Sequence, residues 1–132
     1  MARTVKEMID EANALVPKLG FDEAQAMIAK GGVLVLDVRD APELALTGTI
    51  AGARHVSRGM LEFRADPASP YHDADFDPAR PVLVYCASGG RSALGGKVLK
   101  DMGYAQVYNI GGFKDWAEAG GAVDHPVEPG MT

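Results

Sequence analysis

The chain contains little of several residue types that many binding sites and architectures require. It has a single cysteine, so it can form neither an intrachain disulfide nor a metal site built on several cysteines. Its three histidines are scattered, and no two would share one face of a helix or strand. No apolar run approaches the length of a membrane span. We therefore expect no metal, no cofactor and no membrane partner, and we expect His55, His72 and His125 on loops or on the surface.

Basic residues are fewer than acidic ones. The 13 Lys and Arg against 18 Asp and Glu give a formal charge of −5 at pH 7, whereas a nucleic-acid surface needs a basic patch, so nucleic acid is not an expected partner. Charged residues also interrupt the start of the chain, where a signal peptide needs a continuous apolar segment. Because a lone cysteine also suits a reducing compartment, we predict a cytoplasmic location. The interrupting residues are Arg3, Lys6, Glu7, Asp10 and Glu11.

Helix and strand patterns alternate along the 132 residues, which suffice for one hydrophobic core and not for two domains. A capping box at Thr4–Glu7 opens an amphipathic helix that Pro17 ends, and Asp22 is expected to cap a second helix. Continuous apolar runs such as VLVLDV are typical of strands covered on both faces. The alternation predicts an α/β fold, with an open, mostly parallel sheet flanked by helices on both faces. The expected helices are 5–16, 23–30, 92–102 and 113–119, and the expected strands are 33–38, 53–56, 82–85 and 107–110.

The single cysteine, Cys86, follows the apolar run VLVY and begins a loop rich in glycine and serine. A strand, a tight loop and a helix N-terminus in that order form an anion cradle, because backbone N–H groups and the helix dipole converge on one point. Gly89 and Gly90 permit the backbone conformations that turn N–H groups inward. Arg91 adds a positive charge, and we expect it to help lower the pKa of Cys86 and so favour the nucleophilic thiolate. The alternative is a buried cysteine that serves only as a small apolar residue.

Three segments resemble, in order and spacing, the signatures of the rhodanese-like domains, the sulfurtransferases. They are LVLDVRDAPEL…GTIAGARHV, VLVYCASGGRSALGG and NIGGFKDWAEAGGAV, and the resemblance runs from about Phe21 to Val123. It implies a cysteine that takes a sulfane sulfur from thiosulfate or a low-molecular-weight persulfide, holds it as a persulfide, and passes it to a thiol, cyanide or a protein thiol. On this basis residues 21–123 form the rhodanese-like domain, 1–20 an N-terminal helical extension and 124–132 an irregular tail.

The resemblance also implies roles for individual residues. Cys86 matches the nucleophile that carries the persulfide. The loop expected to bind the persulfide comprises Ala87, Ser88, Gly89, Gly90, Arg91 and Ser92. Five further matches, Asp37, Arg39, Glu43, Gly112 and Trp116, are expected to support the structure rather than the chemistry. The chain departs from the family at 48–53, where the usual Gly-His-Ile-Pro-Gly-Ala reads Gly-Thr-Ile-Ala-Gly-Ala, outside the loop.

Residues 57–80 form a longer insert than compact members of the family carry. One hypothesis makes this insert a lid over the loop, with Arg58, Glu62 and Arg64, and also Tyr71 or His72, at the pocket edge. The other hypothesis makes it a surface loop with one short helix. The sequence alone does not separate the two.

Two other function classes stay open at this stage. A cysteine phosphatase or arsenate reductase on the same fold would place Cys and Arg six positions apart, whereas Cys86 and Arg91 are five apart. A non-catalytic module would bind a partner, for example through the amphipathic helix at 5–16. That helix must bury its apolar stripe, either on its own domain or on a second copy, so a homodimer is a further expectation.

Overall fold

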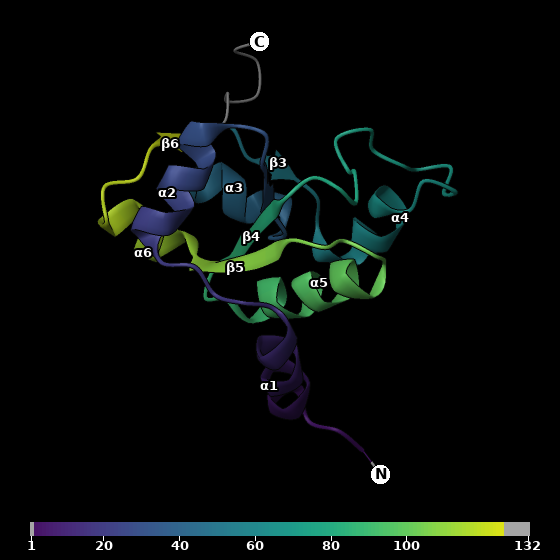
Figure 1. The fold of residues 1–132 in the computed structure, drawn as a ribbon. Helices are drawn as coiled ribbons and strands as arrows, with labels where there is room; N and C mark the ends of the chain where they lie inside the picture. The colour runs from purple at the N-terminus through teal and green to yellow at the C-terminus, as the bar shows by residue number, and fades with distance from the viewer. Residues whose placement is uncertain (1, 126–132) are drawn as a thin grey trace.

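An open sheet of four parallel strands organises the protein, whose computed structural model describes residues 2–125 (Figure 1). The strands are β1 (Leu34–Asp37), β3 (Arg54–His55), β4 (Val82–Cys86) and β5 (Val107–Gly112), in the spatial order β3-β1-β4-β5. Each neighbouring pair is parallel, so the carboxyl ends of all four strands meet at one edge. Binding sites in open parallel sheets lie at that edge, and Cys86 is the last residue of β4. The predicted parallel sheet is confirmed.

Helices cover both faces of the sheet. In Figure 1, α2, α3 and α6 lie on one side, and α1 and α5 lie on the other. A short antiparallel pair, β2 (Thr49–Ile50) and β6 (Val123–Asp124), lies apart from the main sheet. The helices are α1 (Val5–Leu15), α2 (Phe21–Lys30), α3 (Ala41–Thr47), α4 (Leu61–Ala65), α5 (Gly90–Asp101) and α6 (Phe113–Glu118), with a 3₁₀ turn at Arg58–Met60 before α4.

Two hydrophobic cores, one on each face, explain the continuous apolar sequence of β4. Val82, Val84 and Cys86 belong to the core beneath α5, while Leu83 and Tyr85 belong to the core beneath α2 and α6. All five residues of β4 are buried. Successive side chains of a strand point to opposite faces, so a strand covered on both faces must be apolar throughout. The same alternation places Cys86 on the α5 side of the sheet edge.

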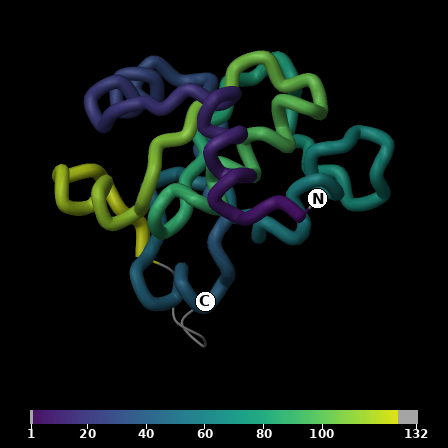
Figure 2. The backbone as a smooth tube through the Cα atoms, turned by 90° about the horizontal axis from the view of Figure 1, so that it is seen from below, coloured from purple at the N-terminus to yellow at the C-terminus, as the bar shows by residue number. Residues whose placement is uncertain are grey.

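Helix α1 packs on the body of its own domain and lies across the α5 side of the sheet (Figure 2). Its capping box is formed, because the Thr4 hydroxyl accepts from the Glu7 N–H and the Glu7 carboxylate accepts from the Thr4 N–H. Val16, just after the helix, is fully buried, and a Cβ added at Gly96 of α5 would lie 3.0 Å from its Cγ1. The absence of a side chain at Gly96 therefore lets α1 approach α5 closely.

Some expected elements differ from those observed. Helix α2 begins at Phe21 with Gly20 as its N-cap, so Asp22 lies in the first turn and does not cap the helix. Helix α3 was not expected, and His55 lies half-buried in β3 rather than on a loop or the surface. The chain after 122 was expected to be irregular, but residues 123 and 124 form β6; the expectation for 126–132 lies outside the described residues. No helix within 2–125 is long and apolar enough to cross a membrane.

Candidate active site

The loop from Cys86 to Gly90 joins β4 to α5 at the carboxyl edge of the sheet. Gly89 has a φ of +101°, in the left-handed region that side chains other than glycine rarely adopt. This conformation turns the Gly89 N–H toward the Cys86 sulfur, 3.0 Å away. The N–H of Ser92, in the first turn of α5, lies 3.4 Å from the same sulfur. The loop thus places two backbone donors around one atom.

The Ser92 side chain completes the surroundings of the sulfur. Its Oγ lies 3.4 Å from Cys86 Sγ, and both residues are almost fully buried. Burial of the sulfur opposes ionisation, but the hydrogen bonds from the Ser92 side chain and from the N–H groups of Ser92, Ser88 and Gly89 outweigh it. The pKa of Cys86 is therefore lowered from its ordinary value, which favours the thiolate.

Asn109, a residue that the sequence analysis missed, holds this arrangement from β5. Its Oδ1 accepts hydrogen bonds from the Ser92 hydroxyl at 2.8 Å and from the Gly111 N–H at 2.9 Å. Its Nδ2 donates to the Gly89 carbonyl at 3.1 Å. A polar residue within the apolar strand at 107–110 was the available signal, because a buried amide needs partners. Asn109 therefore ties β5 to the end of the loop and to the first turn of α5.

Gly112 lies beside the loop, whereas the contacts of Trp116 are with α2 and with the chain at Ala122. A Cβ added at Gly112 would lie 2.4 Å from the Ala87 carbonyl oxygen, so a side chain there would displace the loop. Trp116 packs against Phe21 with ring centroids 4.9 Å apart, and its Nε1 donates to the Ala122 carbonyl at 3.0 Å. These contacts are those of residues that support the fold.

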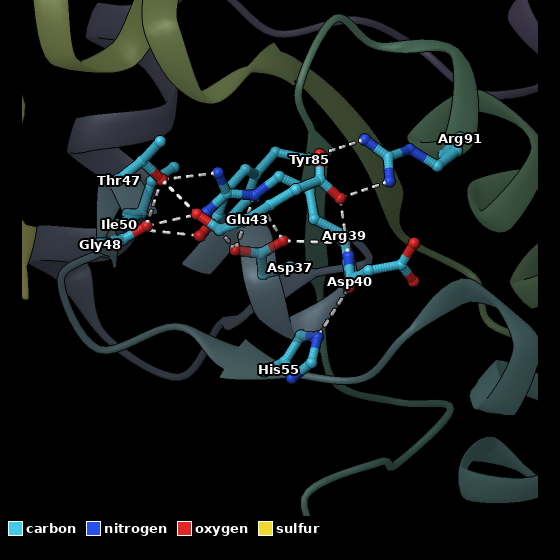
Figure 3. Close-up of polar contacts among 10 residues, drawn as sticks. All are labelled: Asp37, Arg39, Asp40, Glu43, Thr47, Gly48, Ile50, His55, Tyr85 and Arg91. Atoms are coloured by element: carbon cyan, nitrogen blue, oxygen red, sulfur yellow. Dashed lines mark hydrogen bonds and ion pairs between the residues drawn. The ribbon is translucent and has the colours of Figure 1, made fainter. Parts of the chain in front are cut away.

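Arg91 turns toward helix α3 and pairs with Glu43 (Figure 3). Both terminal nitrogens of the guanidinium donate to the Glu43 carboxylate at 2.8 Å. Glu43 also accepts from the Asp40 N–H at 2.9 Å, which closes the first turn of α3. The bond from Arg91, aided by that N–H, lowers the pKa of Glu43 to about 2. The charge of Arg91 is thus largely matched by a carboxylate, and its Coulombic interaction with Cys86 is smaller than that with Glu43.

A second ion pair is buried beneath α3. The Arg39 guanidinium donates to the Asp37 carboxylate at 2.8–3.1 Å and to the Gly48 carbonyl at 2.9 Å, and both charged side chains are almost fully buried. The guanidinium also lies over the Phe113 ring, 4.7 Å from its centroid. His55 meets the Arg39 carbonyl through Nε2 at 2.7 Å. This cluster ties β1 to the chain after α3 (Figure 3).

Comparison with known proteins identifies the family. The model of the Rhodanese-like domain matches residues 21–119. The chain belongs to the rhodanese-like domain family. The thiosulfate sulfurtransferase GlpE of Coxiella burnetii (strain RSA 493 / Nine Mile phase I) is 34% identical over 95 residues, which cover 71% of this chain and 80% of that protein. GlpE of Stutzerimonas stutzeri (strain A1501) is 33% identical, over 72% of this chain and 79% of its own length.

Two solved structures share both the fold and appreciable sequence. A protein of unknown function from Rhodopseudomonas palustris CGA009, RPA3614, described as a possible tyrosine phosphatase, is 40% identical with a TM-score of 0.88, over 94% of this chain and 96% of that one. The polysulfide-sulfur transferase homodimer from Wolinella succinogenes is 29% identical with a TM-score of 0.74, over 95% of this chain and 90% of that one. Both matches extend over more of the chain than the family match.

Two cavities border the Cys86 loop of this rhodanese-like domain, and the insert residues expected at the pocket edge line neither of them. One cavity is lined by Ser88, Gly89 and Gly90, and the other by Ala87. Within the described residues, Arg58 pairs with Glu62 at 2.9 Å, and Arg64 donates to the Tyr71 carbonyl at 3.3 Å. Those contacts lie within the insert itself. Within 2–125, no group of three or more His, Cys, Asp or Glu is placed to hold a metal ion.

Proposed function

We propose that this protein is a sulfurtransferase that carries a sulfane sulfur on Cys86 as a persulfide. One observation carries the proposal: two backbone N–H groups and one hydroxyl surround the sulfur of the single cysteine, at 3.0–3.4 Å. Donors arranged in this way stabilise a compact anion without proton transfer. Relatives named thiosulfate sulfurtransferase, about one-third identical, support the same activity.

The reaction follows from the properties of the thiolate. Cys86 S⁻ attacks the outer sulfur of thiosulfate, the S–S bond of the donor breaks, and sulfite leaves with the electron pair. The product, Cys86–S–S⁻, keeps its charge within the loop. A second thiolate or cyanide then attacks the terminal sulfur and restores Cys86 S⁻, so the kinetics are of the ping-pong type. Neither step needs a general acid or base, in keeping with a site that contains no histidine among its described residues.

A small-molecule donor and a thiol or cyanide acceptor are the partners that this mechanism requires, and a protein thiol would serve chemically as well. A reducing compartment such as the cytoplasm suits an enzyme whose single cysteine must return to the thiolate after each cycle. We also keep the homodimer as a proposal, because α1 exposes Val5, Met8 and Leu15, and because the Wolinella succinogenes relative is described as a homodimer.

Phosphate-ester hydrolysis is the second candidate, because the Rhodopseudomonas palustris relative is described as a possible tyrosine phosphatase. A phosphoryl group needs donors around three oxygens, and an arginine commonly binds two of them. Here the Arg91 guanidinium makes two bonds to Glu43 instead. Pairing of this kind favours sulfur transfer over phosphatase chemistry. The lowered pKa of Cys86 argues against a non-catalytic module, because such a module would have no use for a reactive thiolate.

The test is the intact mass of the protein after incubation with thiosulfate, a persulfide donor or an aryl phosphate. We expect one added sulfur atom on the parent protein, its loss on addition of cyanide, and no added mass on a Cys86→Ser variant. Thermal unfolding of Cys86→Ser shows whether that variant folds. If the protein hydrolyses the aryl phosphate in a way that depends on Cys86, and Cys86 takes up no sulfur, the proposed function becomes that of a phosphatase.

A further inference from the structure

The Ser92 hydroxyl lies within reach of two acceptors. Its oxygen is 2.8 Å from Asn109 Oδ1 and 3.4 Å from the Cys86 sulfur. A hydroxyl has one proton, so it can donate to only one of these two atoms at a time. All three side chains are buried, and Asn109 is only 3% exposed, so the sulfur gains or loses a donor according to which acceptor the hydroxyl chooses.

The side-chain amide of Asn109 has one orientation that satisfies its neighbours. Its Oδ1 accepts from the Gly111 N–H at 2.9 Å, and its Nδ2 donates to the Gly89 carbonyl at 3.1 Å. A flipped amide would place donor against donor and acceptor against acceptor. The amide oxygen therefore faces Ser92, and the hydroxyl is the donor in the 2.8 Å bond. In this arrangement the Ser92 oxygen is left to accept from the S–H of Cys86.

The backbone of Asn109 is held by the linker between α1 and α2. The Asn109 N–H donates to the Pro17 carbonyl at 2.9 Å, and the Asn109 carbonyl accepts from the Leu19 N–H at 3.1 Å. These two linker residues precede the part of the chain that matches the family model. With the bonds to Gly89 and Gly111 as well, Asn109 stays in place when the Ser92 hydroxyl rotates.

We propose that Asn109 is a positioning residue, which gives the Ser92 proton a second acceptor and so lets the hydroxyl follow the negative charge onto and off the Cys86 sulfur. The inference rests on the proposed function and adds a residue that regulates its nucleophile. In the thiolate, the hydroxyl donates to Cys86 S⁻. When this sulfur attacks the outer sulfur of thiosulfate, the donor S–S bond breaks, sulfite leaves with the electron pair, and the negative charge of the enzyme passes to the outer sulfur of the persulfide. The hydroxyl then returns to Asn109.

The competition by Asn109 affects how reactive the thiolate is. A thiolate that is more strongly stabilised forms at lower pH but attacks more slowly, with a Brønsted coefficient of about 0.4–0.5 for attack on sulfur. Without Asn109, the Ser92 hydroxyl would stay on the Cys86 sulfur and would have to be withdrawn as the new S–S bond forms. Asn109 therefore keeps the thiolate reactive at the cost of a smaller decrease in its pKa.

The charged groups around the Cys86 loop are the same in the neutral variants compared below, so they do not alter the comparison. Arg91 interacts with Cys86 through its charge while it pairs with Glu43. The other charged groups on elements around the loop are Asp40 before α3, the pair Asp37 and Arg39 after β1, Lys18 in the linker, the pair Arg58 and Glu62 of the insert, and Lys97 of α5 with Glu11 and Asp101.

The experiment measures the pKa of Cys86 by the pH dependence of iodoacetamide alkylation in the parent, Asn109→Leu, Ser92→Ala and the double variant. Leucine has a size similar to asparagine and forms no hydrogen bond, and the Gly89 carbonyl keeps its bond from the Ala93 N–H at 3.0 Å. We expect Asn109→Leu to lower the pKa by about one unit. Ser92→Ala should then raise it by about two units in the Asn109→Leu background, against about one in the parent, the range of a hydrogen bond to a charged group.

Sulfur loading from thiosulfate supplies a second measurement. At a pH where Cys86 is fully ionised, Asn109→Leu should load about threefold more slowly than the parent, because a thiolate of lower pKa is a weaker nucleophile. A loop that is merely loosened would lose donors to the sulfur, so the pKa would rise instead. A raised pKa in Asn109→Leu, or equal effects of Ser92→Ala in the two backgrounds, would overturn the proposal.

Two further variants control for damage to the loop. Asn109→Asp keeps an acceptor for the Ser92 hydroxyl, so the effect of Ser92→Ala should be no larger there than in the parent; a larger effect would overturn the proposal even if Asn109→Leu fails to fold. Asn13→Leu is the matched control, because Asn13 lines the cavity beside the loop and its Oδ1 has no hydrogen-bond partner. We expect Asn13→Leu to leave the pKa of Cys86 unchanged, and thermal unfolding shows which variants fold.

Alkylation needs no sulfur donor, so this test separates the positioning role from the proposed function. If Ser92→Ala has the larger effect in Asn109→Leu while thiosulfate loads no sulfur on the parent, the positioning role is supported and sulfur transfer is overturned. If the parent loads normally while Ser92→Ala has equal effects in both backgrounds, the positioning role is overturned and the proposed function stands.

Discussion

Replacement of Ser92 by alanine should raise the pKa of Cys86 by about one unit. The Ser92 hydroxyl has a single proton, which it donates to Asn109 Oδ1 at 2.8 Å, while its oxygen lies 3.4 Å from the Cys86 sulfur. When Cys86 is a thiol, its S–H can donate to Ser92 Oγ. When Cys86 is a thiolate, the hydroxyl must turn toward the sulfur and give up the bond to Asn109.

This competition limits the size of the effect. A hydrogen bond to a charged group contributes about 1.5–3 kcal/mol. The long contact to sulfur and the lost bond to Asn109 place the Ser92 contribution near the lower end, and about 1.4 kcal/mol corresponds to one pKa unit. The remaining stabilisation comes from the backbone N–H groups of Ser88, Gly89 and Ser92, which the substitution retains. The variant should therefore still load sulfur, but more slowly at pH 7, because less of its cysteine is ionised.

The pH dependence of iodoacetamide alkylation measures this pKa, since only the thiolate reacts. Arg91→Ala is the comparison, because the structure pairs that guanidinium with Glu43. We expect its effect on the Cys86 pKa to be smaller than that of Ser92→Ala. A larger shift in Arg91→Ala would show that the arginine charge, and not the local hydrogen bonds, controls ionisation of the sulfur. Thermal unfolding of both variants checks that the loop has not simply collapsed.

Two further predictions concern stability and can be measured by urea denaturation. Gly96→Ala should destabilise the protein by about 1–3 kcal/mol, because the new methyl group would lie 3.0 Å from Val16, just after α1. Gly59→Ala is the control, because a Cβ there meets nothing within 4 Å. Equal effects of the two substitutions would refute the close approach of α1 to α5. Arg39→Met should cost about 3–5 kcal/mol, because it leaves the buried carboxylate of Asp37 without its partner. Addition of Asp37→Asn to Arg39→Met should restore part of that loss, and a purely additive result would contradict the pairing.

The parallel sheet and the position of Cys86 could be predicted because their sequence signals are local. The run VLVY is apolar throughout, as two-sided burial requires, and the loop after it is rich in glycine. Helix α3 also has a local signal, the sequence Asp40-Ala-Pro-Glu43, in which Glu43 accepts from the Asp40 N–H. That signal is the same capping pattern that correctly predicted α1, but the helix it opens is only seven residues long and lacks a buried residue.

The partners of Arg91 and Asn109 could not be predicted from local signals. Arg91 and Glu43 are 48 positions apart, and their pairing depends on where α3 lies relative to the start of α5. Asn109 is 17 positions from Ser92, and their bond joins β5 to the first turn of α5. A sequence shows which residues are polar, but only the packing shows which polar groups meet. The expectation that Arg91 acts on the sulfur therefore stays a prediction, to which the structure adds a contact outside the loop.

The pairing of Arg91 with Glu43 bears on which anion the loop can hold. A phosphoryl group presents three oxygens, and a guanidinium turned inward would bind two of them. In this protein both terminal nitrogens of Arg91 are taken by one carboxylate, whose pKa of about 2 keeps it charged at any physiological pH. Two backbone N–H donors and the Ser92 hydroxyl oxygen remain, and all three lie within 3.4 Å of a single sulfur atom. Glu43→Gln removes the partner of Arg91, so the charge of Arg91 should move nearer to the sulfur and lower the pKa of Cys86 further. An unchanged pH profile of iodoacetamide alkylation would show that Arg91 stays away from the Cys86 loop even without Glu43.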